Sequence, residues 1–237
     1  MIQLHFGSGR RLVYGVYHPA TGTRLRRGVL LLNPYGWEAL RAHRTLRALA
    51  LRLAGGGFDV LRFDYSCTGD SLGDREDASW EDWMEDADYA LDELQSMAGL
   101  RKVSLVGLRM GALVAAALAD ERPDVVDRQV LWAPPARGGD VVRWARSGHE
   151  GEVDAFPIGR RLEDQLDRLD LAALRSSGGL SLVLGLGRPG REVQSVGGTE
   201  VITLSPDDPH CWMQDRDRGA GAVPTKLLDR IATWITG

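Results

Sequence analysis

Apolar positions along this chain follow two alternating patterns, which predict a sheet whose strands are joined by helices. A continuous apolar run at residues 28–33 and an apolar, β-branched run at 103–108 are typical of strands that are buried on both faces, and residues 58–64 are a further predicted strand between them. Between them, residues 38–54 and 80–97 have apolar side chains at helical spacing and polar side chains on the opposite face. Strands that alternate with helices in this way predict a mostly parallel sheet covered on both faces.

Further elements are predicted on either side of this central part. The other predicted strands are residues 2–6, 11–17, 128–133, 180–186 and 200–204, and further helices end near residue 119 and span 223–235. Between residues 137 and 179 the periodicity weakens to a short helix at 141–146 and an amphipathic pattern over 162–174. We therefore expect a core made of residues 1–136 and 180–237, with residues 137–179 inserted as a helical cap.

Composition and charge narrow the class of protein. The chain has 237 residues, of which 43% are hydrophobic and 26% charged, as is typical of a soluble globular domain. Its net charge of -4 mixes both signs and argues against a nucleic-acid partner. Neither a signal peptide nor an apolar run of ~20 residues is present, so we expect a cytoplasmic protein without a membrane span. Arg41, Arg44, Arg47 and Arg52, on the helix predicted at 38–54, are expected to form a solvated face.

The stretch between residues 103 and 114 contains the most informative motif. An apolar run ends in Gly107-Leu108-Arg109-Met110-Gly111, and a helix rich in Ala and Leu follows at once. This is the pattern of a nucleophile elbow, G-x-S-x-G, whose glycines permit a tight turn and whose central residue is the nucleophile. Arg109 occupies the central position. Arginine cannot attack a carbonyl group, because its guanidinium stays protonated and has no acceptor lone pair.

Two other segments complete a family pattern. Asn33-Pro34-Tyr35-Gly36 follows one predicted strand, and Arg62-Phe63-Asp64-Tyr65 with Thr68-Gly69-Asp70-Ser71 follows the next. Together with the elbow, these motifs resemble the α/β-hydrolase superfamily over nearly the whole chain. The resemblance is strongest to its serine-aminopeptidase-like group, which includes exosortase-associated hydrolases, some with arginine in this motif. It implies an α/β-hydrolase fold: a mostly parallel, eight-stranded sheet with helices on both faces and a small helical cap.

The resemblance also implies a triad in the chain order nucleophile, acid, histidine. The family's histidine follows the last strand, and His210 is the histidine of this sequence in that loop. Three acids are open as its partner. Asp140, after the strand at 128–133, is our choice, whereas Asp207 and Asp208 are loop neighbours of His210, with less room to orient its ring.

Other residues are expected to border the substrate. The family's oxyanion-hole positions fall on the backbone N–H groups of Tyr35 and Met110, which need no serine. Asn33 belongs to the same loop as Tyr35, and Trp212 to the loop of His210. Four tryptophans are expected at the carboxyl edge of the sheet, some as walls of an apolar pocket and some in packing: Trp37, Trp132, Trp144 and Trp212.

The two cysteines do not form a disulfide framework, and their spacing does not suggest a metal site. Cys67 stands where the family usually has glycine, and Cys211 is expected to be structural. Cys67 is an alternative nucleophile with His210 as its base. The expected strand order separates Cys67 from the elbow by roughly 10 Å, which favours a buried structural thiol. We expect neither a metal nor a cofactor.

Two functions from different classes remain open. The first is an atypical enzyme that uses Arg109 to anchor an anion and His210 as acid and base. Its substrate would be an acyl or carboxylate-bearing small molecule. The second is a catalytically inactive pseudohydrolase that binds a ligand or partner. An open pocket beside Arg109 favours the enzyme, whereas an ion pair between Arg109 and an acid such as Asp140 favours the pseudohydrolase. The oligomeric state is left open.

Overall fold

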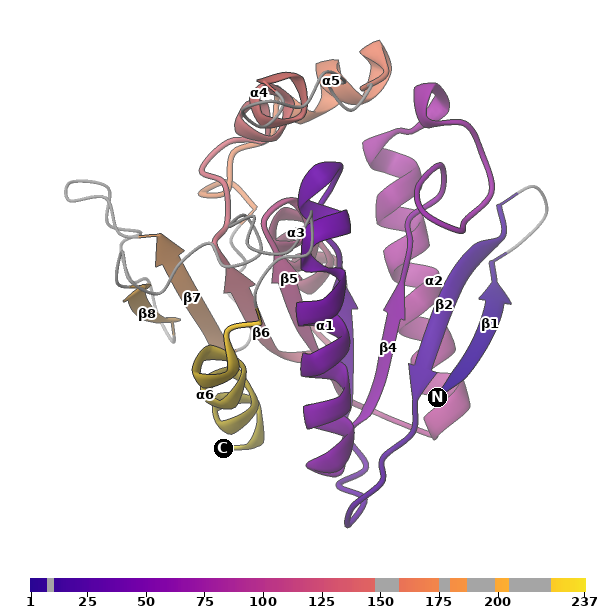
Figure 1. Ribbon diagram of the computed structural model, residues 1–237, viewed down its shortest axis with the longest axis vertical. Helices are drawn as coiled ribbons and strands as arrows, with labels where there is room; N and C mark the ends of the chain where they lie inside the picture. Colours follow the sequence, from indigo (N-terminus) through magenta and orange to yellow (C-terminus); the bar gives the residue numbers. More distant parts are fainter. Residues whose placement is uncertain (8–10, 148–157, 175–179, 187–198, 205–222) are drawn as a thin grey trace.

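A single eight-stranded sheet forms the centre of the computed structural model (Figure 1). The structure describes residues 1–7, 11–147, 158–174, 180–186, 199–204 and 223–237. The strands are β1 (Ile2–Phe6), β2 (Val13–His18), β3 (Gly28–Leu32), β4 (Asp59–Phe63), β5 (Val103–Leu108), β6 (Val126–Trp132), β7 (Leu180–Leu186) and β8 (Thr199–Leu204). Their order across the sheet is β1-β2-β4-β3-β5-β6-β7-β8.

The sheet is mostly parallel, as the alternating pattern predicted. The β1–β2 and β2–β4 pairs are antiparallel, and every pair from β4 to β8 is parallel. β3 lies between β4 and β5. This is the expected strand order, in which two inter-strand steps separate the strand before Cys67 from the strand before the elbow. The carboxyl ends of the parallel strands therefore meet along one edge of the sheet, where ligands of open α/β folds bind.

Helices cover both faces of the sheet (Figure 1). They are α1 (Trp37–Gly55), α2 (Trp80–Ala98), α3 (Met110–Glu121), α4 (Gly138–Ser147), α5 (Arg160–Leu166) and α6 (Thr225–Thr236), with a short 3-10 helix at Arg75–Asp77. α1 and α6 pack on one face, and α2 and α3 on the other; α4 and α5 lie beyond the carboxyl ends of the strands. In the described part of the chain, none of the helices has the length and hydrophobicity needed to cross a membrane.

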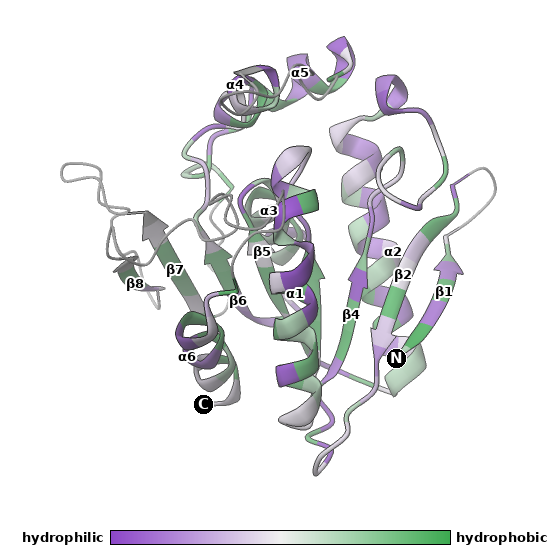
Figure 2. Cartoon of the chain, in the orientation of Figure 1, coloured by the Kyte–Doolittle hydropathy of each residue, from purple (hydrophilic) through white to green (hydrophobic). Residues whose placement is uncertain are grey.

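Side chains of the strands alternate between two hydrophobic cores. Leu30 and Leu32 of β3 pack in the core beneath α2 and α3, whereas Val29 and Leu31 pack in the core beneath α1 and α6. Figure 2 shows the hydrophobic residues concentrated along these central strands. Each fully buried leucine or valine contributes roughly 1.5–3 kcal/mol. The two cores together fix the sheet, and hence the positions of the loops that follow its strands.

Two of the local predictions were wrong. Arg41 is only 2% exposed, although it was assigned to a solvated face. It lies three residues after Glu38 and four before Thr45, both also buried, so helical spacing puts it on the inward side of α1. The amphipathic pattern over 162–174 is helical only to Leu166, because the chain then turns and Asp170 forms a β-bridge with Arg137.

Candidate functional site

The connection between β5 and α3 forms a sharp turn centred on Arg109. Its backbone angles are φ 56° and ψ −117°, a region that side-chain-bearing residues rarely occupy. Such a conformation costs about 1–3 kcal/mol and persists only when its surroundings enforce it. Here the Arg109 N–H donates to the Trp132 carbonyl at 2.8 Å, and its own carbonyl accepts from Ala112 N–H at 2.9 Å. The turn thus places the side chain of residue 109 at the carboxyl edge of the sheet.

Two glycines allow this turn to close. A Cβ atom on Gly107 would lie 2.2 Å from the Gly111 carbonyl oxygen. One on Gly111 would lie 2.2 Å from the Leu32 carbonyl oxygen at the end of β3. Both distances are far shorter than any real Cβ contact, and backbone atoms cannot move aside cheaply. The predicted need for glycine at these two positions is therefore confirmed.

The guanidinium of Arg109 has three partners from three different elements. Its Nε donates to Glu38 Oε1 at 2.7 Å, and its Nη1 donates to the Ala133 carbonyl at 3.1 Å. Its central carbon lies 5.3 Å from the centroid of the Trp144 ring, within range of a cation–π contact. Glu38 is in the first turn of α1, Ala133 follows β6, and Trp144 belongs to α4. Arg109 thus connects the sheet, α1 and α4.

This ion pair is almost completely withdrawn from water. Arg109 is 7% exposed and Glu38 is 6% exposed. Burial raises the pKa of the Glu38 carboxyl, and the positive charge and hydrogen bond of Arg109 oppose that rise. Taking either charge out of water alone would be strongly unfavourable, so each side chain requires the other. Arg109 therefore has a protein carboxylate as its counter-ion.

The identity of that carboxylate differs from the three acids considered from the sequence. Asp140 lies in the first turn of α4, where it accepts a hydrogen bond from Arg137 N–H at 3.2 Å and pairs with Arg143. The structure places it with its own helix and not with Arg109. Glu38 was not proposed, although one signal was present: it shares the inward face of α1 with Ala42 and Leu46, and a carboxylate there needs a cation.

The residues expected to form the oxyanion region have defined contacts. Asn33 Nδ2 donates to the Phe63 carbonyl at 2.6 Å and to Asp64 Oδ1 at 3.2 Å, which ties the end of β3 to the end of β4. The Tyr35 ring is buried and lies 5.3 Å from the Trp83 ring. Met110 is fully buried as the first residue of α3, where helices leave backbone N–H groups without an intrahelical acceptor.

Cys67 lies in the loop after β4, half-buried and with a positive φ of 63°. Its N–H donates to the Leu72 carbonyl at 2.9 Å, and a Cβ atom on Gly73 would lie 2.5 Å from its sulfur. Burial raises the pKa of the Cys67 thiol, and the carboxylates of Asp77 and Asp82 raise it further. The protonated thiol is a poor nucleophile, so this environment is that of a packing residue.

Several residues expected at the site lie outside the described part of the chain: His210, Trp212, Cys211, Asp207 and Asp208. Of the other tryptophans, Trp132 is fully buried in the core beneath α1 and α6, so its role is packing. Trp144 contacts Arg109, and Trp37 begins α1. Among the described residues, no group of three or more His, Cys, Asp or Glu side chains could hold a metal ion.

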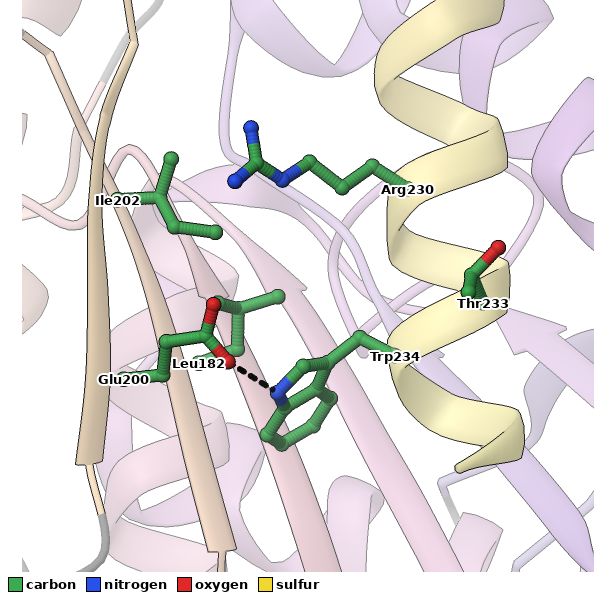
Figure 3. Close-up of a pocket in the computed structure, with 6 residues that line it drawn as sticks. All are labelled: Leu182, Glu200, Ile202, Arg230, Thr233 and Trp234. Carbon is green, nitrogen blue, oxygen red and sulfur yellow. Dashed lines mark hydrogen bonds between the residues drawn. The ribbon is translucent and has the colours of Figure 1, made fainter.

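A cavity of about 330 Å³ lies away from Arg109, between the edge strand β8 and α6 (Figure 3). It is lined by Leu182, Glu200, Ile202, Arg230, Thr233 and Trp234. Trp234 Nε1 donates to Glu200 Oε2 at 3.1 Å, and Figure 3 shows Arg230 reaching from α6 toward Ile202. Because these residues follow neither the β3 nor the β5 end, the cavity is separate from the turn at Arg109.

The chain resembles known proteins in both sequence and structure. A model of the family described as serine aminopeptidase, S33, matches residues 26–154, more than half of the chain. This segment contains the end of β3, the loop after β4 and the turn at Arg109. The search of curated protein sequences found no match.

Solved structures with a similar fold include three hydrolases. A putative hydrolase from Agrobacterium vitis S4 is 26% identical over 77% of each chain, with a TM-score of 0.51. Est1E from Butyrivibrio proteoclasticus, solved with ferulic acid, is 12% identical over 98% of each chain, with a TM-score of 0.76. A serine hydrolase homologue from Coxiella burnetii is 15% identical over 99% of this chain and 95% of its own, with a TM-score of 0.58. The likeness to the last two concerns the fold alone.

Proposed function

The chain belongs to the serine aminopeptidase family S33 of the α/β hydrolases, and from this premise we propose that it is a pseudohydrolase. It binds a ligand or a partner at the carboxyl edge of its sheet and forms no acyl-enzyme. The observation that carries the proposal is the buried ion pair between Arg109 and Glu38. At the turn where this family presents its nucleophile, the chain has a side chain that cannot attack a carbonyl group.

The partners of Arg109 support a structural role for it. An anion anchor would offer a positive charge that a substrate neutralises, but Glu38 already neutralises Arg109 within the protein. A second hydrogen bond joins Arg109 to the Ala133 carbonyl, and the Trp144 ring lies against its guanidinium. A substrate carboxylate would therefore have to compete with a preformed, buried protein carboxylate. The side chain closes this part of the site.

The atypical enzyme is the second candidate, and one observation favours it. Arg109 Nη2 has no hydrogen-bond acceptor among the described residues, and the residue as a whole retains a small exposed surface. One oxygen of an anionic substrate could bind there, with His210 as acid and base and Asp140 as the expected acid partner. In this alternative the N–H groups of Tyr35 and Met110 would bind the developing negative charge, and Asn33, Cys67 and Trp212 would border the substrate.

We also propose that residues 137–179 act as a cap over this site, and that residues 1–136 and 180–237 form the core. The contact between Trp144 of α4 and Arg109 supports this division. α3 contacts α4, so α4 lies next to the turn, and α5 packs on α4. The expected cytoplasmic location remains a prediction.

A hydrolysis assay on the full chain separates the two candidates. We would measure release of p-nitroaniline from alanine p-nitroanilide and of p-nitrophenol from p-nitrophenyl acetate, for the wild type and for His210→Ala. The pseudohydrolase proposal expects both proteins to give the rate of buffer alone. Turnover by the wild type that His210→Ala abolishes would replace the proposal with the enzyme alternative.

A further inference from the structure

A second buried arginine belongs to β4, which β3 separates from β5 and the turn that follows it. Arg62 of β4 is 8% exposed and faces α1, because the side chain of Val60, two residues earlier, packs in the core beneath that helix. It is paired in register with Val16 of β2. α1 runs along this face beside β4 (Figure 1). Arg62 thus lies at the base of the surface between β2 and α1.

The guanidinium of Arg62 is only partly satisfied. Its Nε donates to His18 Nε2 at 3.2 Å, and none of the described residues accepts a hydrogen bond from either terminal nitrogen. The charge of Asp64 acts on Arg62, but its carboxylate forms its hydrogen bonds elsewhere: it accepts from Asn33 Nδ2 at 3.2 Å and from Asp70 N–H at 3.1 Å. A buried arginine normally has an acid opposite its planar set of donors. Here no carboxylate among the described residues forms an ion pair or a hydrogen bond with those donors.

His18 cannot supply the missing negative charge. It is 2% exposed, and burial together with the charge of Arg62 lowers its pKa to about 4. At neutral pH its imidazole is therefore uncharged, as it must be to accept the hydrogen bond from Arg62. The pair keeps the full positive charge of the guanidinium, which stays protonated although burial lowers its pKa.

α1 adds the permanent positive charge of Arg47 and the imidazole of His43 beside this pair. Arg47 and His43 lie on the exposed side of the helix, one turn apart, and Arg47 forms no ion pair with a described residue. The pKa of His43 is lowered by partial burial and by the charges of Arg62 and Arg47, whereas Asp64 and Asp70 act in the opposite sense. The charges of Arg47 and Arg62 both act on His18 as well, so these side chains form one cluster.

We propose that Arg62, Arg47 and His43 form a binding site for a phosphate monoester on the α1 face of the sheet. A phosphate dianion matches two permanent cations better than a singly charged carboxylate does, and its oxygens can accept from several donors at once. The two unfilled nitrogens of Arg62 form the base of the site, and α1 supplies the wall. This site shares no residue with the turn at Arg109 and goes beyond the function proposed above.

The experiment titrates inorganic phosphate into the full chain at neutral pH and low salt, with calorimetric detection. We expect Arg47→Gln to weaken binding about tenfold, because a charge-assisted contact is lost. Arg44→Gln is the matched control: it removes the same charge from an exposed position of the same helix, and we expect a change of less than about twofold. Arg62→Gln should abolish binding. If Arg62→Gln fails to fold, Arg47→Gln still tests the proposal.

A second readout is the pKa of His43, followed through the NMR resonances of the histidines. Bound phosphate should raise the pKa of His43, because a nearby negative charge favours the imidazolium. Three outcomes would overturn the proposal: the absence of phosphate binding, equal weakening by Arg44→Gln and Arg47→Gln, or binding of acetate as tightly as phosphate. None of these readouts depends on Arg109 or on turnover, so the result is independent of the pseudohydrolase proposal.

Discussion

Two arginines, Arg109 and Arg62, are buried to the same degree but in opposite electrostatic settings. Arg109 is 7% exposed and pairs with the carboxylate of Glu38, whereas Arg62 is 8% exposed and pairs with the neutral imidazole of His18. The first pair carries no net charge, and the second keeps one positive charge. Burial alone therefore does not tell whether an arginine is structural or available to a ligand. The chemistry of its partner decides.

The comparison assigns different tasks to the two regions. At the turn after β5, the Arg109–Glu38 pair fills and joins three elements in the place where this family presents a nucleophile. At the β2–α1 surface, the two terminal nitrogens of Arg62 have no hydrogen-bond acceptor among the described residues, and the charge of Arg47 acts on the same two neighbours, His18 and His43. Arg109 thus has a carboxylate bound to its guanidinium, whereas Arg62 has none bound to it among the described residues.

The largest expected effect comes from removing the carboxylate at the turn. Glu38→Gln should lower the free energy of unfolding by about 3–5 kcal/mol, because it leaves the buried charge of Arg109 uncompensated. Urea denaturation at neutral pH measures this change. Asp229→Asn, which breaks the exposed pair between Arg52 and Asp229, is the control and should change stability by less than about 1 kcal/mol.

The double variant Glu38→Leu/Arg109→Met tests whether the uncompensated charge of Arg109 causes this loss of stability. Because it removes both charges, it should be far less destabilised than Glu38→Gln, within about 2 kcal/mol of the wild type. If Glu38→Gln proved no more harmful than Asp229→Asn, the ion pair would not be the structural element that we describe.

The second prediction concerns the pH dependence of the region around Arg62. The pKa of His18 is about 4 in the folded protein and near 6.5 in the unfolded chain, so the unfolded chain binds more protons between these values. Stability contributed by neutral His18 is therefore present above about pH 6.5 and is lost as pH falls toward 4. At about pH 5 the loss should be roughly 2 kcal/mol.

His18→Gln tests this assignment, because its amide oxygen can accept the Arg62 hydrogen bond without titrating. The difference in unfolding free energy between about pH 7 and pH 5 should shrink in the variant by roughly the same 2 kcal/mol. An unchanged pH dependence would mean that another group titrates in this window.

The smallest expected effect is at the contact between α4 and the turn. Trp144→Ala should lower stability by about 0.5–2 kcal/mol, because Arg109 loses a cation–π contact while keeping Glu38. Trp144→Phe, which retains an aromatic face, should recover part of the loss. Hydrogen exchange of the α4 amides should accelerate in Trp144→Ala; unchanged exchange would show that the ring does not hold this helix.

The sequence predicted the sheet well and the ion pairs poorly, for physical reasons. β7 begins and ends at the predicted residues, because a short run rich in leucine and valine, interrupted only by Ser181 and Gly185, is a local signal. The Arg109–Glu38 pair joins residues 71 positions apart, and the Arg62–His18 pair joins residues 44 apart. No local pattern specifies such partners.

The expectation that an acid such as Asp140 pairs with Arg109 failed for a related reason. The loop after β6 lies near the turn, as the Ala133 contact to Arg109 shows. Within α4, however, Arg143 lies three residues after Asp140 and binds it first. Arg143 therefore pairs with Asp140, and Glu38, on the inward face of α1, is the acid beside Arg109. The role of Asp140 as the acid partner of His210 stays a prediction.

The most direct test of the central claim is intact-mass spectrometry of the full chain after treatment with a fluorophosphonate, which reacts with activated serines. If Arg109 fills the position of the nucleophile and no other serine is activated, the wild-type mass should stay unchanged. One equivalent of adduct on any serine of the wild type would contradict the account and identify a displaced nucleophile.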